Sequence, residues 1–246
     1  MSAVLRSLQA PPSPDELAGV WRADQLARSP QATQPSGHAA LDAELPGGGW
    51  PLGQLTEILQ AQSGQHEWRL LLPALQAVAQ RGPLVLVGAP HLPHLPVLAA
   101  LGIAPDRVLR LDARTPAERL WAAEQALRCK DIGTLLAWLP QVRSEQLRRL
   151  QLNGSASQAL VFALRPLDAQ RESSPAPLRV AVQCGEGTQL ALQLLKRRGP
   201  PRDQPLALDA PLPVLAALKP VRRRTTEPDH AVDRPARARI RRLAAA

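Results

Sequence analysis

SGHAALDAELPGGGWPLGQLTEIL, residues 36–59, is the stretch of sequence that decides the fold. Three consecutive glycines on their own are typical of a flexible turn. Here they are followed by a strand-like run, Leu55–Leu59, and from there the chain alternates between strand-like and helix-like segments. We therefore expect the folded core to begin near Gly37, at the head of this stretch.

Apolar runs of strand length recur along the core, at 83–88, 107–111, 134–139 and 159–164. Helices are expected between them, at about 66–81, 93–101, 116–129 and 144–154, the last with Ser144 as its N-cap. The third of these helices has the clearest start, because Thr115 and Glu118 form a capping box and Pro116 takes the first helical position. This alternation predicts an α/β fold with a mostly parallel central sheet flanked by helices.

Two more runs, Leu178–Cys184 and Thr188–Leu195, are joined by the tight turn Gly185–Gly187. They predict an antiparallel β-hairpin that closes one edge of the sheet.

The aromatic residues and the cysteines are expected in the core. Trp21, Trp50, Trp68, Trp121 and Trp138, with Phe162, fall mostly on predicted helices and strands rather than among arginines. Cys129 and Cys184 show no metal-ligand spacing, so we expect two buried, reduced thiols.

The chain is expected to have three parts. Residues 1–36 hold an amphipathic helix over Asp15–Arg28 and a linker over Ser29–Ser36, which has no apolar pattern and two prolines. Residues 37–218 form the α/β core, and residues 219–246 form a basic tail that we expect to be disordered on its own. In the N-terminal helix, Trp21 is a candidate anchor for self-association, with docking on its own core as the alternative.

The charge of the chain points to a nucleic acid, an acidic partner or an anionic surface. Its 246 residues carry 30 basic and 21 acidic side chains, a net charge of +9. No apolar stretch approaches the roughly 20 residues that span a bilayer, and the first residues lack the core of a secretory signal. We therefore expect a cytoplasmic, nucleoid-associated protein.

Two-thirds of the net charge lies in the tail. Nine cations and three acids in residues 219–246 give +6. Ala236, Ile240 and Leu243 could form one helical stripe on a partner, with the neighbouring arginines facing acidic groups or DNA phosphates. A solvated charge run is the alternative. The candidate partner-binding or DNA-binding residues are Arg222, Arg223, Arg224, Arg237, Arg239, Ile240, Arg241, Arg242 and Leu243.

The stretch 36–59 resembles the beginning of the core domain of RecA-type ATPases. The resemblance rests on a run of matching positions: Gly37, Leu41, Asp42, Leu45, Gly47, Gly48, Gly49, Pro51, Gly53, Glu57 and Ile58. It implies a RecA-like core in which a phosphate-binding loop, G-x-x-x-x-G-K-[ST], follows the first strand.

That loop is degenerate in this chain. Continuing in register puts Gln60 and Gln65 at the two glycine positions, His66 at the lysine and Glu67 at the hydroxyl residue. The three lysines of the chain, Lys130, Lys196 and Lys219, lie in no Gly-Lys-Ser/Thr context. An anionic Glu67 would repel an approaching phosphate.

The catalytic carboxylates are replaced as well. By the same resemblance, the metal-binding acid would fall near Trp138 and the water-activating glutamate near Pro90. We therefore expect no ATP hydrolysis, no nucleotide or metal cofactor and no enzymatic activity.

A RecA-like core with a defunct loop resembles one family in particular, the ImuA proteins associated with translesion DNA synthesis, which are often grouped with the SulA cell-division inhibitors. Val20–Arg22, Glu44–Pro51 and Glu67–Leu75 carry this resemblance, which spans roughly Asp15–Leu195. It implies a non-enzymatic adaptor of an SOS-induced mutagenesis complex. The implied partners are ImuB, an inactive Y-family polymerase relative, an error-prone C-family polymerase and DNA, with RecA or a second copy as further candidates.

Two alternatives remain at this point. One is a SulA-like inhibitor of cell division, which needs no ATP either, so that only its partner distinguishes it from an adaptor. The other is a RecA-type DNA-dependent ATPase, which the missing Gly-Lys-Ser/Thr argues against.

Overall fold

A computed structural model describes residues 32–211, and its centre is one eight-stranded sheet. Five neighbouring strands in the order β8-β3-β7-β6-β4 and the edge strand β5 pair in parallel, while β9 and β10 add antiparallel pairs at the other end. The strands are β3 (Leu55–Gln60), β4 (Leu84–Val87), β5 (Val108–Leu111), β6 (Thr134–Trp138), β7 (Leu160–Pro166), β8 (Leu178–Cys184), β9 (Gln189–Lys196) and β10 (Leu206–Asp209). The predicted α/β fold with a mostly parallel sheet is confirmed.

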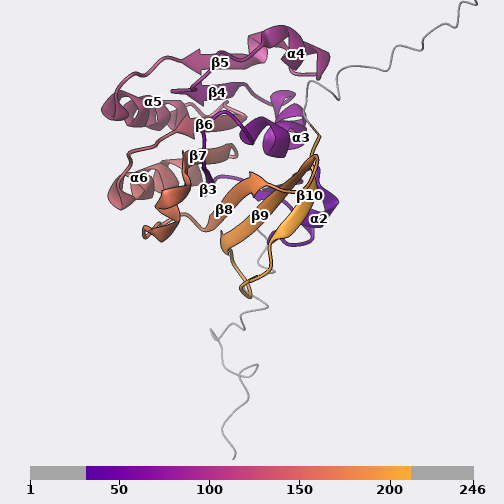
Figure 1. Ribbon diagram of the computed structural model, residues 1–246. Coiled ribbons are helices and arrows are strands. Elements are labelled where there is room, and N and C mark those ends of the chain that lie inside the picture. Colours follow the sequence, from indigo (N-terminus) through magenta and orange to yellow (C-terminus); the bar gives the residue numbers. More distant parts are fainter. Residues whose placement is uncertain (1–31, 212–246) are drawn as a thin grey trace, which may run out of the picture.

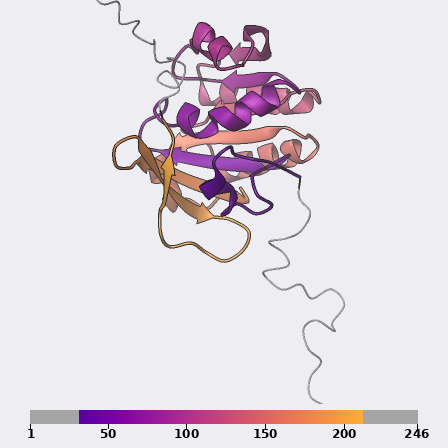
Figure 2. The same cartoon turned by 90° about the vertical axis from the view of Figure 1, so that its right-hand side faces the viewer.

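Helices cover both faces of this sheet (Figures 1 and 2). They are α2 (Ala39–Asp42), α3 (Glu67–Ala79), α4 (Leu95–Ala100), α5 (Pro116–Arg128) and α6 (Ser144–Ser155), with short 3-10 helices η2 (Pro105–Arg107) and η3 (Leu167–Arg171). Alternating strand residues pack into two large hydrophobic clusters, since successive side chains of a strand point to opposite faces of the sheet. In β4, Leu84 and Leu86 pack in the cluster that contains α3 and α4, whereas Val85 and Val87 pack with α5 and α6.

Helix α5 begins as its sequence predicts. The Thr115 hydroxyl accepts a hydrogen bond from the Glu118 N–H, and the Glu118 carboxylate accepts one from the Thr115 N–H. For α6 the predicted N-cap is off by one residue: Arg143 is the cap and Ser144 is the first helical residue. The helix also runs through Asn153 and Gly154 to Ser155, and Gly154 lies close to Gly53 and to Val161 of β7, which suits a residue without a side chain.

The predicted hairpin β8–β9 forms, but it does not close the sheet. Strand β10 pairs antiparallel with β9 and takes the edge position. It comes after a proline-rich connection, so its partner could not be inferred from local pattern.

The predicted linker is partly a strand. Thr33–Gln34 forms β1, which pairs with β2 (Trp50–Pro51), and the linker prediction is wrong for these two residues. This pairing explains the third glycine of the run, since a Cβ on Gly49 would lie 2.3 Å from the Gln34 carbonyl oxygen. The division into an N-terminal part, a core and a tail stays a prediction.

Not every aromatic residue or cysteine lies in the core. Trp50 is buried and its ring meets Phe162 edge to face, with centroids 5.4 Å apart. Trp121, in contrast, is 64% exposed, because it lies about 100° around α5 from buried Leu120. Both cysteines are free and exposed, so the prediction of buried thiols is wrong. Cys129 follows the end of α5, and Cys184 lies beyond the last residue of β8 that pairs with β3.

A buried ionic cluster joins β3 to both of its neighbours. The Glu57 carboxylate, fully buried, accepts hydrogen bonds from Arg165 of β7 at 2.9 Å and from Arg179 of β8 at 2.5 Å. Arg165 also contacts the exposed Glu172 at 2.7 Å. The position that matched the glutamate of the RecA-type run is therefore structural in this chain.

Candidate functional site

The candidate site lies where the carboxyl ends of β3, β4 and β6 meet. In open parallel sheets, ligands bind outside the carboxyl ends of the strands. The segment 61–66 connects β3 to α3, and Glu67 is the first residue of that helix. Trp138 is the last residue of β6, so the structure brings together residues 71 positions apart in the chain.

The buried carboxylate of Glu67 is the centre of the site. Its Oε1 accepts the Gly64 N–H at 2.7 Å and the Trp138 Nε1–H at 2.8 Å, and its Oε2 accepts the His66 N–H at 3.0 Å. Glu67 is fully buried and stands at the N-terminus of the 13-residue helix α3, where the helix dipole favours an anion.

In this arrangement the N–H groups of the loop bind the side chain of Glu67. In a phosphate-binding loop, backbone N–H groups ahead of the helix point at the phosphate oxygens. Here two such N–H groups donate to the Glu67 carboxylate. Glu67 does more than repel a phosphate, as its charge alone predicts, because it occupies the hydrogen-bond donors that a phosphate would need.

The other positions singled out in the sequence lie at the end of β3, in the loop that follows it and in the loop after β4. Gln60 ends β3 and is buried, and His66 caps α3. Gln65 is exposed, and its Nε2 donates to Gln62 Oε1 at 2.7 Å. Pro90, in the loop after β4, lines one cavity together with Gln65 and Trp138.

Gly64 shows how tightly the loop packs. Its φ is +93°, which side chains rarely adopt, and a Cβ there would lie 2.7 Å from the His91 ring. Within residues 32–211, no group of three His, Cys, Asp or Glu residues is placed to hold a metal ion.

The triple substitution Gln65→Gly, His66→Lys and Glu67→Thr is expected to produce no ATPase. It restores the loop residues but leaves Trp138 and Pro90 where metal and water chemistry need carboxylates. Phosphate release from Mg²⁺-ATP, with and without DNA, is the measurement, and the unmodified protein is the blank. Turnover above that blank would show that the register assigned here is wrong.

Two histidines that contact α3 have a lowered pKa. Burial lowers the pKa of His66 below its usual 6.5, and the positive charge of Arg69 lowers it further, while Glu67 acts in the opposite direction. Burial also lowers the pKa of His38, against a hydrogen bond to the Leu70 carbonyl and the charge of Asp42. Near pH 6.5 the unfolded chain therefore binds more protons than the folded one.

The free energy of unfolding is accordingly expected to rise with pH through this region. The contribution of the two histidines is fully present above the unfolded value of 6.5 and is lost as pH drops through the lowered folded-state values. Urea unfolding from about pH 7.5 down to about pH 5 measures this slope. The double variant His38→Asn/His66→Asn should have a flatter slope. An unchanged slope in that variant would contradict the assignment to these two histidines.

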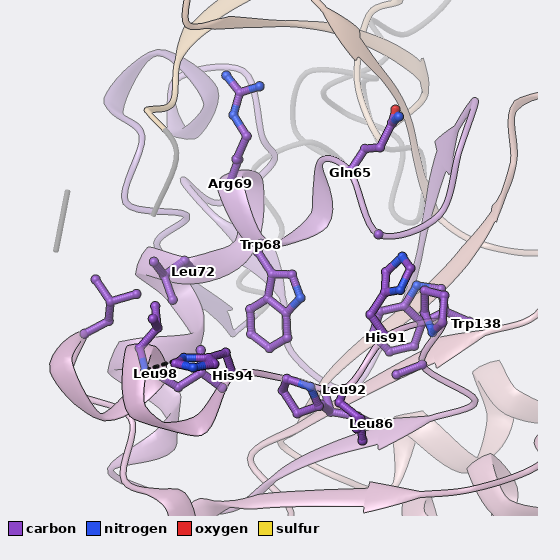
Figure 3. A pocket seen from close by; sticks show the side chains of 16 residues that line it. Gln65, Trp68, Arg69, Leu72, Leu86, His91, Leu92, His94, Leu98 and Trp138 are labelled. Carbon is purple, nitrogen blue, oxygen red and sulfur yellow. Dashed lines mark hydrogen bonds between the residues drawn. The ribbon is translucent and has the colours of Figure 1, made fainter. Parts of the chain in front are cut away.

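An apolar groove opens beside the loop, between α3 and α4 (Figure 3). We call it the α3–α4 groove; its volume is about 540 Å³, within the range of ligand pockets. Trp68 extends into its middle, with Leu98 and His94 of the α4 side opposite His91 and Trp138. Local sequence pattern does not predict this groove, because it forms between two separate helices. The structure shows it also in the exposure of Leu92, in the loop before α4.

Several predictions from the sequence concern residues outside the described range. These are the N-terminal helix with Trp21, and the tail with its candidate contacts Arg222, Arg223, Arg224, Arg237, Arg239, Ile240, Arg241, Arg242 and Leu243. In the described part, no helix is both long enough and apolar enough to cross a membrane.

Fold and site together define an α/β protein with a mostly parallel central sheet, in which the loop between β3 and α3 is filled by its own glutamate. The chain has distant relatives among proteins named cell division inhibitor SulA. It is 30% identical to that of Photorhabdus laumondii subsp. laumondii over 112 residues, 45% of this chain and 63% of that protein. The proteins of Edwardsiella piscicida and Yersinia pestis are each 26% identical, over 117 and 123 residues.

These matches cover only part of each protein. About half of this chain takes part, 47% for the Edwardsiella protein and 50% for the Yersinia protein, which are themselves covered to 70% and 73%. The chain spans less than two thirds of the Photorhabdus protein. No family model matches the chain.

Proposed function

We propose that this protein is a non-catalytic, RecA-like regulator of the bacterial response to DNA damage, which acts by binding other proteins. The observation that carries the proposal is the buried Glu67 carboxylate, which holds two backbone N–H groups of the loop and the Trp138 indole. A loop filled in this way is suited to a fixed scaffold and not to a cycle of nucleotide binding and release.

The first candidate function is inhibition of cell division. It is supported by the relatives, which are named cell division inhibitors and match 45–50% of the chain. Under this proposal the described core binds a component of the division machinery, with the division tubulin homologue as the expected partner, and no nucleotide is consumed.

The second candidate is an adaptor in translesion DNA synthesis. The resemblance of Glu44–Pro51 and Glu67–Leu75 to the ImuA family favours it, and so does the charge of +6 in residues 219–246. Under this proposal an ImuB-like protein and an error-prone C-family polymerase are the partners, and the basic tail contacts DNA phosphates without reading sequence.

A pull-down with the full chain from DNA-damaged cells separates the two candidates. Enrichment of the division tubulin homologue supports the inhibitor, whereas enrichment of an ImuB-like protein with the polymerase supports the adaptor. Both candidates assume that the protein does not hydrolyse ATP, and a nucleotide titration of the same protein tests this assumption. Saturable ATP binding with turnover would overturn both and support the DNA-dependent ATPase.

Removal of residues 219–246 is expected to leave the core folded but to abolish complex assembly and most DNA affinity. The matched control keeps the tail and replaces its nine cations with glutamine. If phosphates are neutralised, the affinity of the full chain falls with salt at a log–log slope of about −0.7 to −0.9 for each phosphate contact. Wild-type assembly and DNA binding by the truncated protein would show that the tail only adds solubility.

A further inference from the structure

The α3–α4 groove exposes apolar surface that the described residues leave uncovered. Trp68 and Leu72 of α3 form one wall, and Val97 and Leu98 of α4 form the other. Leu92, in the loop that precedes α4, is 75% exposed at the groove. A groove of this kind suits the apolar face of a short amphipathic helix.

The described part of the chain ends beside this groove. After β10, Ala210 is buried, and its carbonyl oxygen accepts a hydrogen bond from Arg69 Nε at 2.8 Å. Arg69 follows Trp68 on α3 and itself lines the groove. Figure 1 shows β10 running up toward α3. The segment that follows Pro211 therefore starts next to the groove.

The sequence of that segment repeats the sequence of α4. Residues 95–101 and residues 212–218 both read Leu-Pro-Val-Leu-Ala-Ala-Leu. In the first copy, the valine and the second and third leucines line the groove, whereas Ala99 and Ala100 are exposed. The second copy ends at Lys219-Pro220, which is a stop signal for a helix.

We propose that Leu212–Leu218 of this chain docks as a short helix in the α3–α4 groove. By equivalence with α4, Val214, Leu215 and Leu218 form its apolar face, and Ala216 and Ala217 point outward. Docking there buries the exposed part of Trp68 and Leu92.

The occupant is a segment of the same chain because of where the chain leaves the core. A tethered segment reaches the groove at an effective concentration in the millimolar range, which a second copy does not match in dilute solution. A partner that offers its own apolar helix to the groove must displace this segment, so the groove becomes a site of competition.

Thiol labelling tests the proposal. The background is Cys129→Ser/Cys184→Ser, and the probe is Leu92→Cys. The Leu92→Cys thiol should react with a maleimide about tenfold more slowly than in the same protein carrying Leu215→Asp/Leu218→Asp. The reason is that labelling requires the docked segment to leave the groove. Ala217→Asp also adds a negative charge, but on the outward side of the helix, and it should keep the slow labelling rate. Leu109→Cys, on the edge strand β5, should react equally in all of these proteins.

Hydrogen exchange provides a second measurement without any change in the groove. The α4 amides should exchange more slowly in the unmodified chain than in Leu215→Asp/Leu218→Asp, again with Ala217→Asp as the control. Equal labelling and equal exchange in these proteins would overturn the proposal. Protection that appears only at high protein concentration would also overturn it, by identifying a second copy as the occupant.

Discussion

Glu57→Gln is expected to lower the free energy of unfolding by about 3–5 kcal/mol, since removing one member of a buried ion pair leaves a buried charge uncompensated. Glu57 is the carboxylate that Arg165 and Arg179 share, and all three side chains are buried. For a protein of this size the thermal midpoint should fall by roughly 6–20 °C. Chemical denaturation followed by circular dichroism measures the change.

The matched control for this prediction is Glu172→Gln. Glu172 contacts the same Arg165 at 2.7 Å, but its side chain is 57% exposed. Solvent screens an exposed pair, so the control should cost less than about 1 kcal/mol. If the two substitutions cost the same, burial is not what makes Glu57 important, and the account of the cluster is wrong.

Glu67→Ala is expected to cost about 3–5 kcal/mol, because each buried donor that loses its acceptor costs about 1–3 kcal/mol and the three losses are not fully additive. The three donors are the N–H groups of Gly64 and His66 and the indole of Trp138. Glu145→Ala, an exposed glutamate in the first turn of α6, is the matched control and should change stability by less than about 0.5 kcal/mol.

An anion should restore part of the loss in Glu67→Ala. The vacated donors stand at the N-terminus of α3, where a phosphate or sulfate ion can accept their hydrogen bonds. Millimolar phosphate is therefore expected to raise the thermal midpoint of the variant above that seen in chloride of equal ionic strength, and to leave the unmodified protein unchanged. Equal midpoints in both salts would show that the carboxylate is a packing group and does not stand in a phosphate's place.

Local sequence pattern determined the elements of the core and the residue types that stand at the loop positions. The order of strands and helices from Leu55 to Lys196, the capping box of α5 and the parallel sheet all follow from apolar periodicity and capping residues, which act within a few positions of the chain. In the register of the RecA-type resemblance, the sequence also places His66 and Glu67 where a phosphate-binding loop needs lysine and a hydroxyl residue.

Only the tertiary structure decided which distant residues meet. The pairing of β1 with β2, the edge position of β10 and the exposure of Trp121 depend on contacts between remote segments, which no local period encodes. The charge of Glu67 alone predicts repulsion of a phosphate. Its hydrogen bond to Trp138 exists only because the parallel strands bring their carboxyl ends together. Together with the local hydrogen bonds from the Gly64 and His66 N–H groups, this contact makes the carboxylate the occupant of the loop.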